Sequence, residues 1–149
     1  MILASISENK DREKRIAVTP EIGKKYISLG FNLYLPINYG SHLGFCDEEY
    51  KSLGVNLLSS EEELIKNSDI IIQLGLLDDG KLSLLKENQT LIGSLNAFSN
   101  KEKLEKLKLK KINCFSLELL FHKLGKPQQL PYSQLNLLVR IKYPLIALS

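Results

Sequence analysis

The chain has 149 residues, of which 44% are hydrophobic and 25% charged, and this is the length and composition of one globular domain with its own core. Its net charge of +3 is spread along the sequence, which argues against nucleic-acid binding because such proteins concentrate their basic residues in a stripe. Cys46 and Cys114 lie far apart, which argues against a zinc knuckle or a disulfide framework and favours a reduced, cytoplasmic setting.

Short apolar runs alternate with amphipathic, charged stretches, and this rhythm is typical of β-α-β units. We therefore predict an α/β fold, with a mainly parallel sheet and helices on both of its faces. In chain order the pattern predicts a strand over 2–5, a helix over 20–29, a strand over 32–35, a helix over 47–54, a strand over 55–57, a helix over 60–66, a strand over 69–74, a helix through 83–86, a strand over 89–94, a helix over 100–108 and a strand over 112–116.

Three of the predicted helices carry recognisable start signals. Thr19 is expected to cap the first helix because Pro20, with its fixed φ and missing N–H, suits the first helical position. Ser60 and Glu63 have the spacing of a capping box. Asp47 is expected to cap the short helix between the second and third strands.

Ligands bind at the carboxyl ends of the strands in a sheet of this kind. The candidates there are Gln73, Asn96 and the loop that carries Arg15. Arg15 either belongs to an ordinary charged surface loop or offers its guanidinium fork to a carboxylate or phosphate. None of these residues is a nucleophile or a general base, so no catalytic residue is predicted.

The other candidates for chemistry have simpler explanations. His42 and His122 lack a neighbouring nucleophile or carboxylate constellation in the sequence and are predicted to be loop histidines. The acidic pair at 78–79 is a turn and helix start, and no metal site is predicted. The glycines of the 40–44 loop serve either turn geometry or a ligand loop. The lysine-rich stretch KEKLEKLKLKK at 101–111 is either a solvated helix face or a basic docking patch.

Two further patterns are absent from the sequence. No two of the nine glycines are two positions apart, so the G-x-G-x-x-G fingerprint of a dinucleotide-binding fold is missing, and neither NAD nor NADP is expected to bind this chain alone. No apolar run approaches the roughly 18 to 20 residues that span a bilayer, so direct membrane insertion is not expected.

An ordered series of short segments resembles one protein family. Its members are EKRIAVTP (13–20), LGFNL (29–33), YGSHLGF (39–45), DEEY (47–50), SDIII (68–72) and LKENQTLIG (85–93). In this order and spacing they resemble the N-terminal domain shared by alanine dehydrogenase and the alpha subunit of proton-translocating nicotinamide nucleotide transhydrogenase. The phrases LIGSL (91–95) and CFSLELL (114–120) are more similar to the transhydrogenase subunit.

The resemblance implies a Rossmann-like or flavodoxin-like domain and a role for three residues. In alanine dehydrogenases the arginine matched by Arg15 grips the substrate carboxylate. A lysine and a histidine of those enzymes are matched by Gln73 and Asn96, which cannot supply a cation or exchange a proton, so alanine oxidation is disfavoured. Arg15, Gln73 and Asn96 are therefore expected to bind a ligand rather than to catalyse.

The resemblance also implies partners and cofactors. In the family the domain packs against an NAD-binding domain, and hydride passes between NAD(H) there and NADP(H) on the beta subunit, coupled to proton movement through membrane segments. The expected function is thus a component of an oxidoreductase and translocase, inactive as this chain alone. The expected assembly is a homodimer on the cytoplasmic side of the membrane, held there by partner subunits. The alternative is a non-enzymatic module that binds a small carboxylate or a protein.

The last segment of the chain departs from the family. Residues 1–120 are predicted to be the family domain and 121–149 a divergent basic tail, because all 17 acidic residues precede position 119. The tail is either a genuine membrane- or partner-binding extension or the product of a frame slip near Leu120, which would make the chain a truncated subunit. Codons read across Phe121 and His122 permit Pro or Ser, then Gln, Ile, Arg, Lys and Ala, close to the PRISRA motif of the family.

Overall fold

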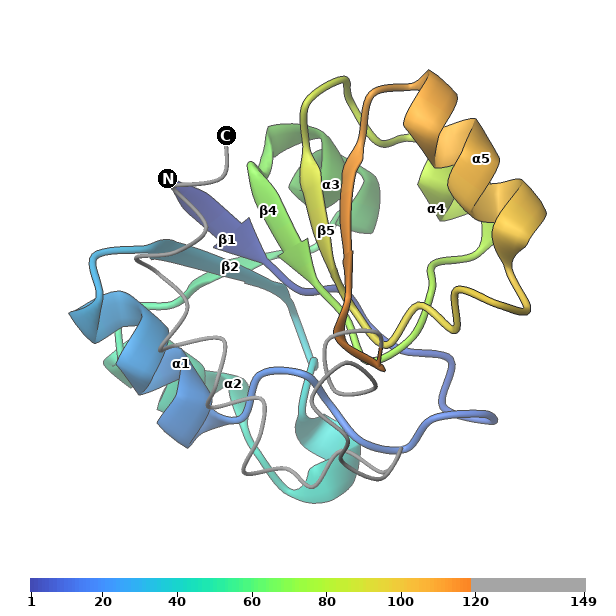
Figure 1. The fold of residues 1–149 in the computed structure, drawn as a ribbon. Coiled ribbons are helices and arrows are strands. Elements are labelled where there is room, and N and C mark those ends of the chain that lie inside the picture. Colours follow the sequence, from blue (N-terminus) through green and yellow to red (C-terminus); the bar gives the residue numbers. More distant parts are fainter. Residues whose placement is uncertain (119–149) are drawn as a thin grey trace.

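The computed structural model describes residues 1–118, and within them six parallel strands form one sheet in the order β3-β2-β1-β4-β5-β6 (Figure 1). The predictions for His122 and for the segment 121–149 lie outside the described residues. The strands are β1 (Ile2–Ala4), β2 (Asn32–Pro36), β3 (Asn56–Leu58), β4 (Ile70–Ile72), β5 (Thr90–Gly93) and β6 (Asn113–Ser116). The helices are α1 (Pro20–Ser28), the 3-10 helix η1 (Ser41–Leu43), α2 (Asp47–Ser52), α3 (Glu61–Asn67), α4 (Asp79–Ser83) and α5 (Lys101–Leu109). The predicted α/β fold is confirmed.

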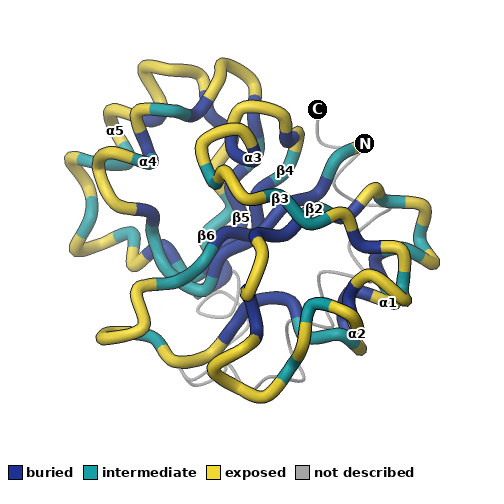
Figure 2. Tube along the Cα trace, turned by 180° about the vertical axis from the view of Figure 1, so that it is seen from behind, coloured by how far each residue is buried: buried dark blue, intermediate teal, exposed yellow. Residues whose placement is uncertain are grey.

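The sheet is covered on both faces because neighbouring residues of each strand point to opposite sides. Leu3 and Ile72 join α1 and α2 in one core cluster, whereas Ala4 and Ile71 join α3, α4 and α5 in the other. Figure 2 shows the same division, with buried strands at the centre and exposed helix surfaces outside. Within residues 1–118, no helix combines the length and the hydropathy that crossing a membrane requires.

Helix capping follows the sequence at two of three positions. The Thr19 side chain accepts a hydrogen bond from the N–H of Ile22 at 3.4 Å, and Ser60 accepts one from Glu63 at 3.2 Å. The prediction for Asp47 is wrong by one residue, because Cys46 occupies the N-cap of α2 without a side-chain bond. The Asp47 carboxylate instead accepts the N–H of Asn38 at 2.9 and 3.1 Å, which ties α2 to the chain just after β2.

Strand β1 lies between the two halves of the sheet. Leu3 is in register with Leu33 of β2 on one side and with Ile70 of β4 on the other. The chain first builds outward from β1 through β2 to β3 and then crosses back to β4. The boundary between β1 and β4 is therefore the topological switch point, where a crevice opens at the carboxyl ends of the strands.

Candidate functional site

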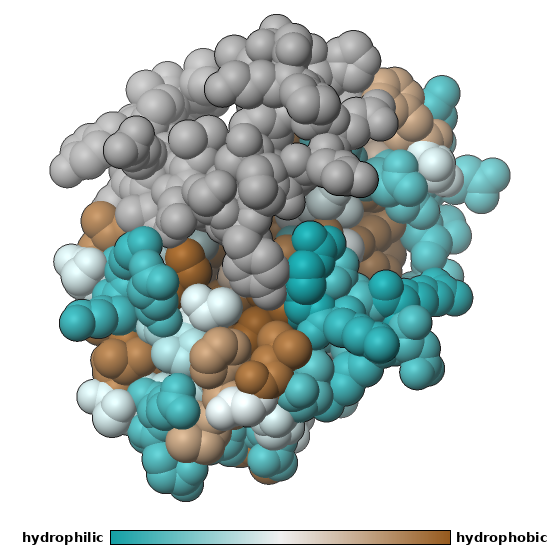
Figure 3. Space-filling view, turned by 90° about the horizontal axis from the view of Figure 1, so that it is seen from below, coloured by the Kyte–Doolittle hydropathy of each residue, from teal (hydrophilic) through white to brown (hydrophobic). Residues whose placement is uncertain are grey.

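A small cleft lies at this switch point, with a volume of about 140 Å³. One wall comes from residues of 7–13, which follow β1, and the other from residues of 73–81, which follow β4. Figure 3 views the molecule from the carboxyl-end side of the sheet, where hydrophilic residues border a hydrophobic centre. The cleft therefore lies where an open parallel sheet normally binds its ligand.

Gln73 lines this cleft while its side chain is tied to the end of β1. Its Oε1 accepts hydrogen bonds from Ser5 Oγ at 2.9 Å and from the N–H of Ile6 at 2.9 Å. A backbone N–H can only donate, so the atom that faces it must be the amide oxygen, and this fixes the orientation of the amide group. Nε2 is then the other end of the amide, and a ligand beside it has to present an acceptor.

The hydrogen bonds behind Gln73 run in one direction. Ser5 Oγ lies 2.7 Å from Tyr39 Oη, and all three residues are buried. Because the single hydroxyl hydrogen of Ser5 is donated to Gln73, the Tyr39 hydroxyl must donate to Ser5. A side chain that can only donate, such as lysine, has no acceptor for Ser5 and Ile6, so the network requires an acceptor at position 73.

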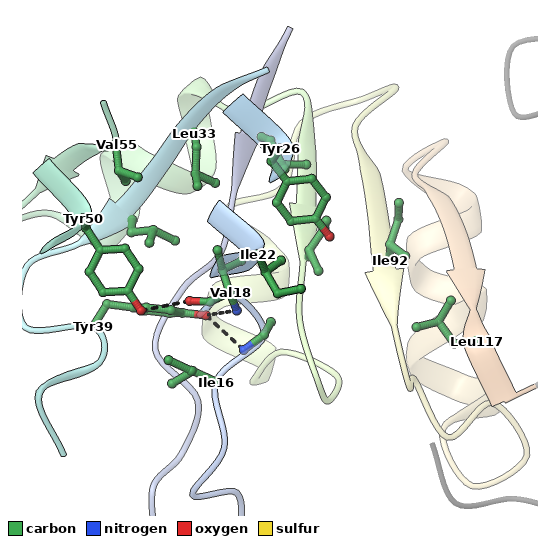
Figure 4. Close-up of a cluster of buried hydrophobic side chains, with 14 residues drawn as sticks. Ile16, Val18, Ile22, Tyr26, Leu33, Tyr39, Tyr50, Val55, Ile92 and Leu117 are labelled. Atoms are coloured by element: carbon green, nitrogen blue, oxygen red, sulfur yellow. Dashed lines mark hydrogen bonds between the residues drawn. The ribbon is translucent and has the colours of Figure 1, made fainter. Parts of the chain in front are cut away.

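Two tyrosine hydroxyls hold the 15–20 segment against the sheet (Figure 4). Tyr39 Oη accepts the N–H of Ala17 at 3.1 Å and of Val18 at 3.3 Å, while Tyr50 Oη donates to the carbonyl of Val18 at 2.9 Å. Burial raises the pKa of Tyr39, so its hydroxyl stays protonated. The apolar triplet after Arg15 is therefore a buried backbone clamp that fixes where the arginine begins.

Arg15 is engaged by a neighbouring carboxylate at the rim of the cleft. Its Nε donates to Glu13 Oε1 at 2.8 Å, its NH2 to Oε2 at 2.7 Å and its backbone N–H to Oε1 at 3.0 Å. The hydrogen bonds and charge of Arg15 lower the pKa of Glu13. Glu13 lines the cleft with Arg12, whereas Arg15 does not. The ligand-binding role of Arg15 remains a prediction.

Asn96 lies apart from the cleft. It is exposed, has a left-handed φ of 48°, and its carbonyl accepts the N–H groups of Ser99 at 3.0 Å and Asn100 at 3.1 Å. Glu118 holds the same loop by accepting from the N–H of Ala97 at 2.9 Å. The structure thus brings Gln73 and the Glu13–Arg15 pair to one site and places Asn96 in a separate turn after β5.

Sequence reasoning missed Glu8, which lines the same cleft. Its Oε1 accepts the N–H of Leu74 at 2.6 Å, just after β4 ends. Burial raises the pKa of Glu8, the backbone N–H groups of Leu74 and Gly75 oppose this, and the charge of Glu13 adds to it. The sequence signal for Glu8 is an acidic residue four positions beyond the first strand, which also fits any surface loop.

Another cation of the cleft, Lys81, is held by a carboxylate. Its Nζ lies 2.8 Å from Glu61 Oε2, and Glu61 Oε1 accepts the N–H of Ser7 at 3.0 Å. His42 is a loop histidine whose Nε2 lies 2.8 Å from the carbonyl of Lys14. Among residues 1–118 no group of three His, Cys, Asp or Glu side chains is placed to hold a metal ion.

The first strand–helix turn does not fit a dinucleotide. A pyrophosphate binds where a glycine-rich turn exposes the N–H groups of a helix N-terminus. Here a long loop, 5–19, precedes α1, Pro20 has no N–H, and Thr19 already accepts from Ile22. The cleft is also smaller than the roughly 300–1,000 Å³ of pockets for drug-sized ligands. No step through NAD or NADP can be built from the residues around this turn and the cleft.

Comparisons with known proteins agree on one family. The family model for "Alanine dehydrogenase/PNT, N-terminal domain" matches residues 5–133 and so reaches into the segment 121–149. An NAD(P) transhydrogenase subunit alpha of Rickettsia prowazekii is 28% identical over 122 residues, which cover 79% of this chain and 32% of that protein. Alanine dehydrogenase 1 of Staphylococcus aureus is 28% identical over 130 residues, covering 87% and 34%.

A solved transhydrogenase from Sinorhizobium meliloti has the same fold, with a TM-score of 0.74 and 23% identity over 80% of this chain and 35% of that one. The chain spans about a third of the length of the relatives that it matches.

Proposed function

The chain belongs to the alanine dehydrogenase/PNT N-terminal domain family, and we propose that it serves as the N-terminal portion of the alpha subunit of a proton-translocating NAD(P) transhydrogenase. In this role it is a component of an enzyme that transfers hydride between NAD(H) and NADP(H) and moves protons. The chain alone carries out neither step.

One observation supports this choice over alanine dehydrogenase. Gln73 and Asn96 stand where the family resemblance places the lysine and histidine of alanine oxidation. The Gln73 side-chain carbonyl accepts from both Ser5 and Ile6, so the position is built for an acceptor and not for a cation. The domain therefore contributes architecture and a small-ligand cleft, and its own residues move no proton at a substrate atom.

Cofactors and partners follow from the same proposal. NAD and NADP act in the complete complex, on an NAD-binding domain and on a beta subunit, because the first strand–helix turn of this chain is closed by Thr19 and Pro20. The membrane subunits place the domain at the cytoplasmic face, and two copies pair as a homodimer. Arg15, Gln73 and Asn96 bind a ligand or an adjoining domain.

The test has two arms. NADH is titrated into the purified chain and followed by the fluorescence of the nicotinamide, and we expect no saturable binding. The chain is then mixed with the NAD-binding domain and beta subunit of a transhydrogenase, and we expect a complex by size-exclusion chromatography. Saturable NADH binding by the chain alone, reduction of NAD with alanine, or failure to form the complex contradicts the proposal.

A second candidate is a non-enzymatic module that binds a small carboxylate or a protein. The cleft favours it, because Gln73 Nε2 and the guanidinium groups near the rim are hydrogen-bond donors that suit a carboxylate. Saturable binding of a small carboxylate together with failure to associate with transhydrogenase subunits would favour this module.

For the segment 121–149 we propose a slip of the reading frame near Leu120. The change from an acid-containing to an acid-free composition and the family-like residues of the shifted frame support it. A genuine basic extension is the alternative. Reading the nucleotide sequence from the Leu120 codon in all three frames separates the two.

A further inference from the structure

The Glu13–Arg15 pair has the geometry of a ligand complex formed within one chain. A guanidinium binds a carboxylate best through two parallel N–H···O bonds, and Arg15 makes this pair of bonds to the two oxygens of Glu13 at 2.8 and 2.7 Å. The backbone N–H of Arg15 adds a third bond at 3.0 Å. The fork that suits a bound carboxylate is thus occupied by one.

The pair is placed where it meets the cleft. Glu13 is one of the residues that line it, and its side chain is 26% exposed against 53% for Arg15. The opposite wall carries Gln73, whose amide orientation is fixed by the Ile6 N–H and directs an N–H donor rather than an acceptor to a ligand. A carboxylate at this position therefore meets donors from both walls.

The pair is also able to open without disturbing the fold. Glu13 and Arg15 are separated by one residue in a surface loop, whereas the clamp by Tyr39 and Tyr50 begins only at Ala17. Exposed ion pairs are worth little, because water competes for both partners. Removing Glu13 therefore leaves the backbone of the loop in place.

We propose that Glu13 is an internal occupant of a carboxylate-binding position formed by Arg15 and the Gln73 amide, and that a small free carboxylate binds by displacing it. This inference rests on the proposed function, because it takes the cleft to be the small-ligand site of the family domain. Glu13 then sets the affinity of the site: a ligand binds only when its carboxylate competes with the Glu13 carboxylate for the same guanidinium.

Acetate is the probe, titrated into the full chain at constant ionic strength. Binding is followed by ¹H–¹⁵N NMR at the Arg15 Nε–H and the Gln73 side-chain amide. We expect Glu13→Gln to raise the acetate affinity about fivefold, because the competing ion pair is lost. Glu87→Gln is the matched control, since Glu87 forms an exposed ion pair with Lys111 at 2.5 Å and lies outside the cleft residues. It changes the net charge equally, and we expect no gain.

Two double variants decide which cation is used. Arg15→Gln added to Glu13→Gln should abolish the gain, while Arg12→Gln added to Glu13→Gln should retain it. The inference is overturned if acetate fails to bind either the original chain or Glu13→Gln, if Glu87→Gln gains as much as Glu13→Gln, or if the gain depends on Arg12 instead. Backbone spectra check that each variant is folded. Because NADH binding and subunit association are not involved, these results are independent of the tests of the proposed function.

Discussion

The Tyr39 hydroxyl offers the sharpest test of how the site is held. In Tyr39→Phe the buried N–H groups of Ala17 and Val18 lose their acceptor, and Ser5 loses a donor. Each buried donor left without a partner costs about 1–3 kcal/mol, so we expect the free energy of unfolding to fall by about 2–4 kcal/mol. The measurement is urea unfolding followed by far-UV circular dichroism, because the chain has no tryptophan.

Two other tyrosines in the same core cluster serve as matched controls. Tyr50→Phe removes one hydrogen bond, to the Val18 carbonyl, and should cost about 1 kcal/mol. The Tyr26 hydroxyl is buried and has no hydrogen-bond partner among the described residues, so Tyr26→Phe should be neutral or stabilising. The reasoning is refuted if Tyr39→Phe destabilises the chain no more than Tyr26→Phe does.

Three further predictions concern the backbone, the pH dependence and the gene. Gly93→Ala should cost about 3 kcal/mol by thermal or urea unfolding, since a Cβ there would clash with the carbonyl oxygen of Gln73, whereas Gly80→Ala, with no atom within 4 Å and a place in α4, should stabilise by about 0.5–1 kcal/mol; equal effects would contradict this. Burial raises the pKa of Glu8 above 4.5, so its contribution to stability is complete below pH 4.5 and is lost as the pH rises through the pKa of the folded state. Urea unfolding from pH 4 to 7 should therefore show the original chain losing stability relative to Glu8→Gln, and parallel curves would refute it. Nucleotide sequencing from the Leu120 codon should reveal a PRISRAQ-like continuation in a shifted frame, and its absence from all three frames would establish the tail as genuine.

Local signals predict most of the fold because they act over a few residues. Thr19 before Pro20, and Ser60 before Glu63, give the two helix starts by hydrogen bonds that the sequence spacing alone determines. The prediction for Asp47 is wrong because its carboxylate finds a backbone N–H at Asn38, nine residues away, in preference to its own helix. Capping by neighbours is readable from sequence, whereas a contact across a loop is not.

The site is predictable in position but not in its connections. That Gln73 lies at a strand end follows from the apolar run before it, and in the structure it comes directly after β4. The fork of Arg15 is filled by Glu13, and the cleft is lined by Glu8, through side-chain rotamers that no pattern of residue types encodes. The sequence identifies which charges are near the edge of the sheet, and the packing decides which of them face the ligand.

The central position of β1 has a consequence for how the chain folds. Its residues leave the ribosome first, yet the backbone N–H of Ile2 bonds to the carboxylate of Asp69, 67 positions later, and Leu3 pairs with Ile70. Contacts between such distant residues form slowly, because a long loop must close before they stabilise anything. The oldest segment of the nascent chain is thus among the last to be completed, and it stays in need of protection until β4 has been made.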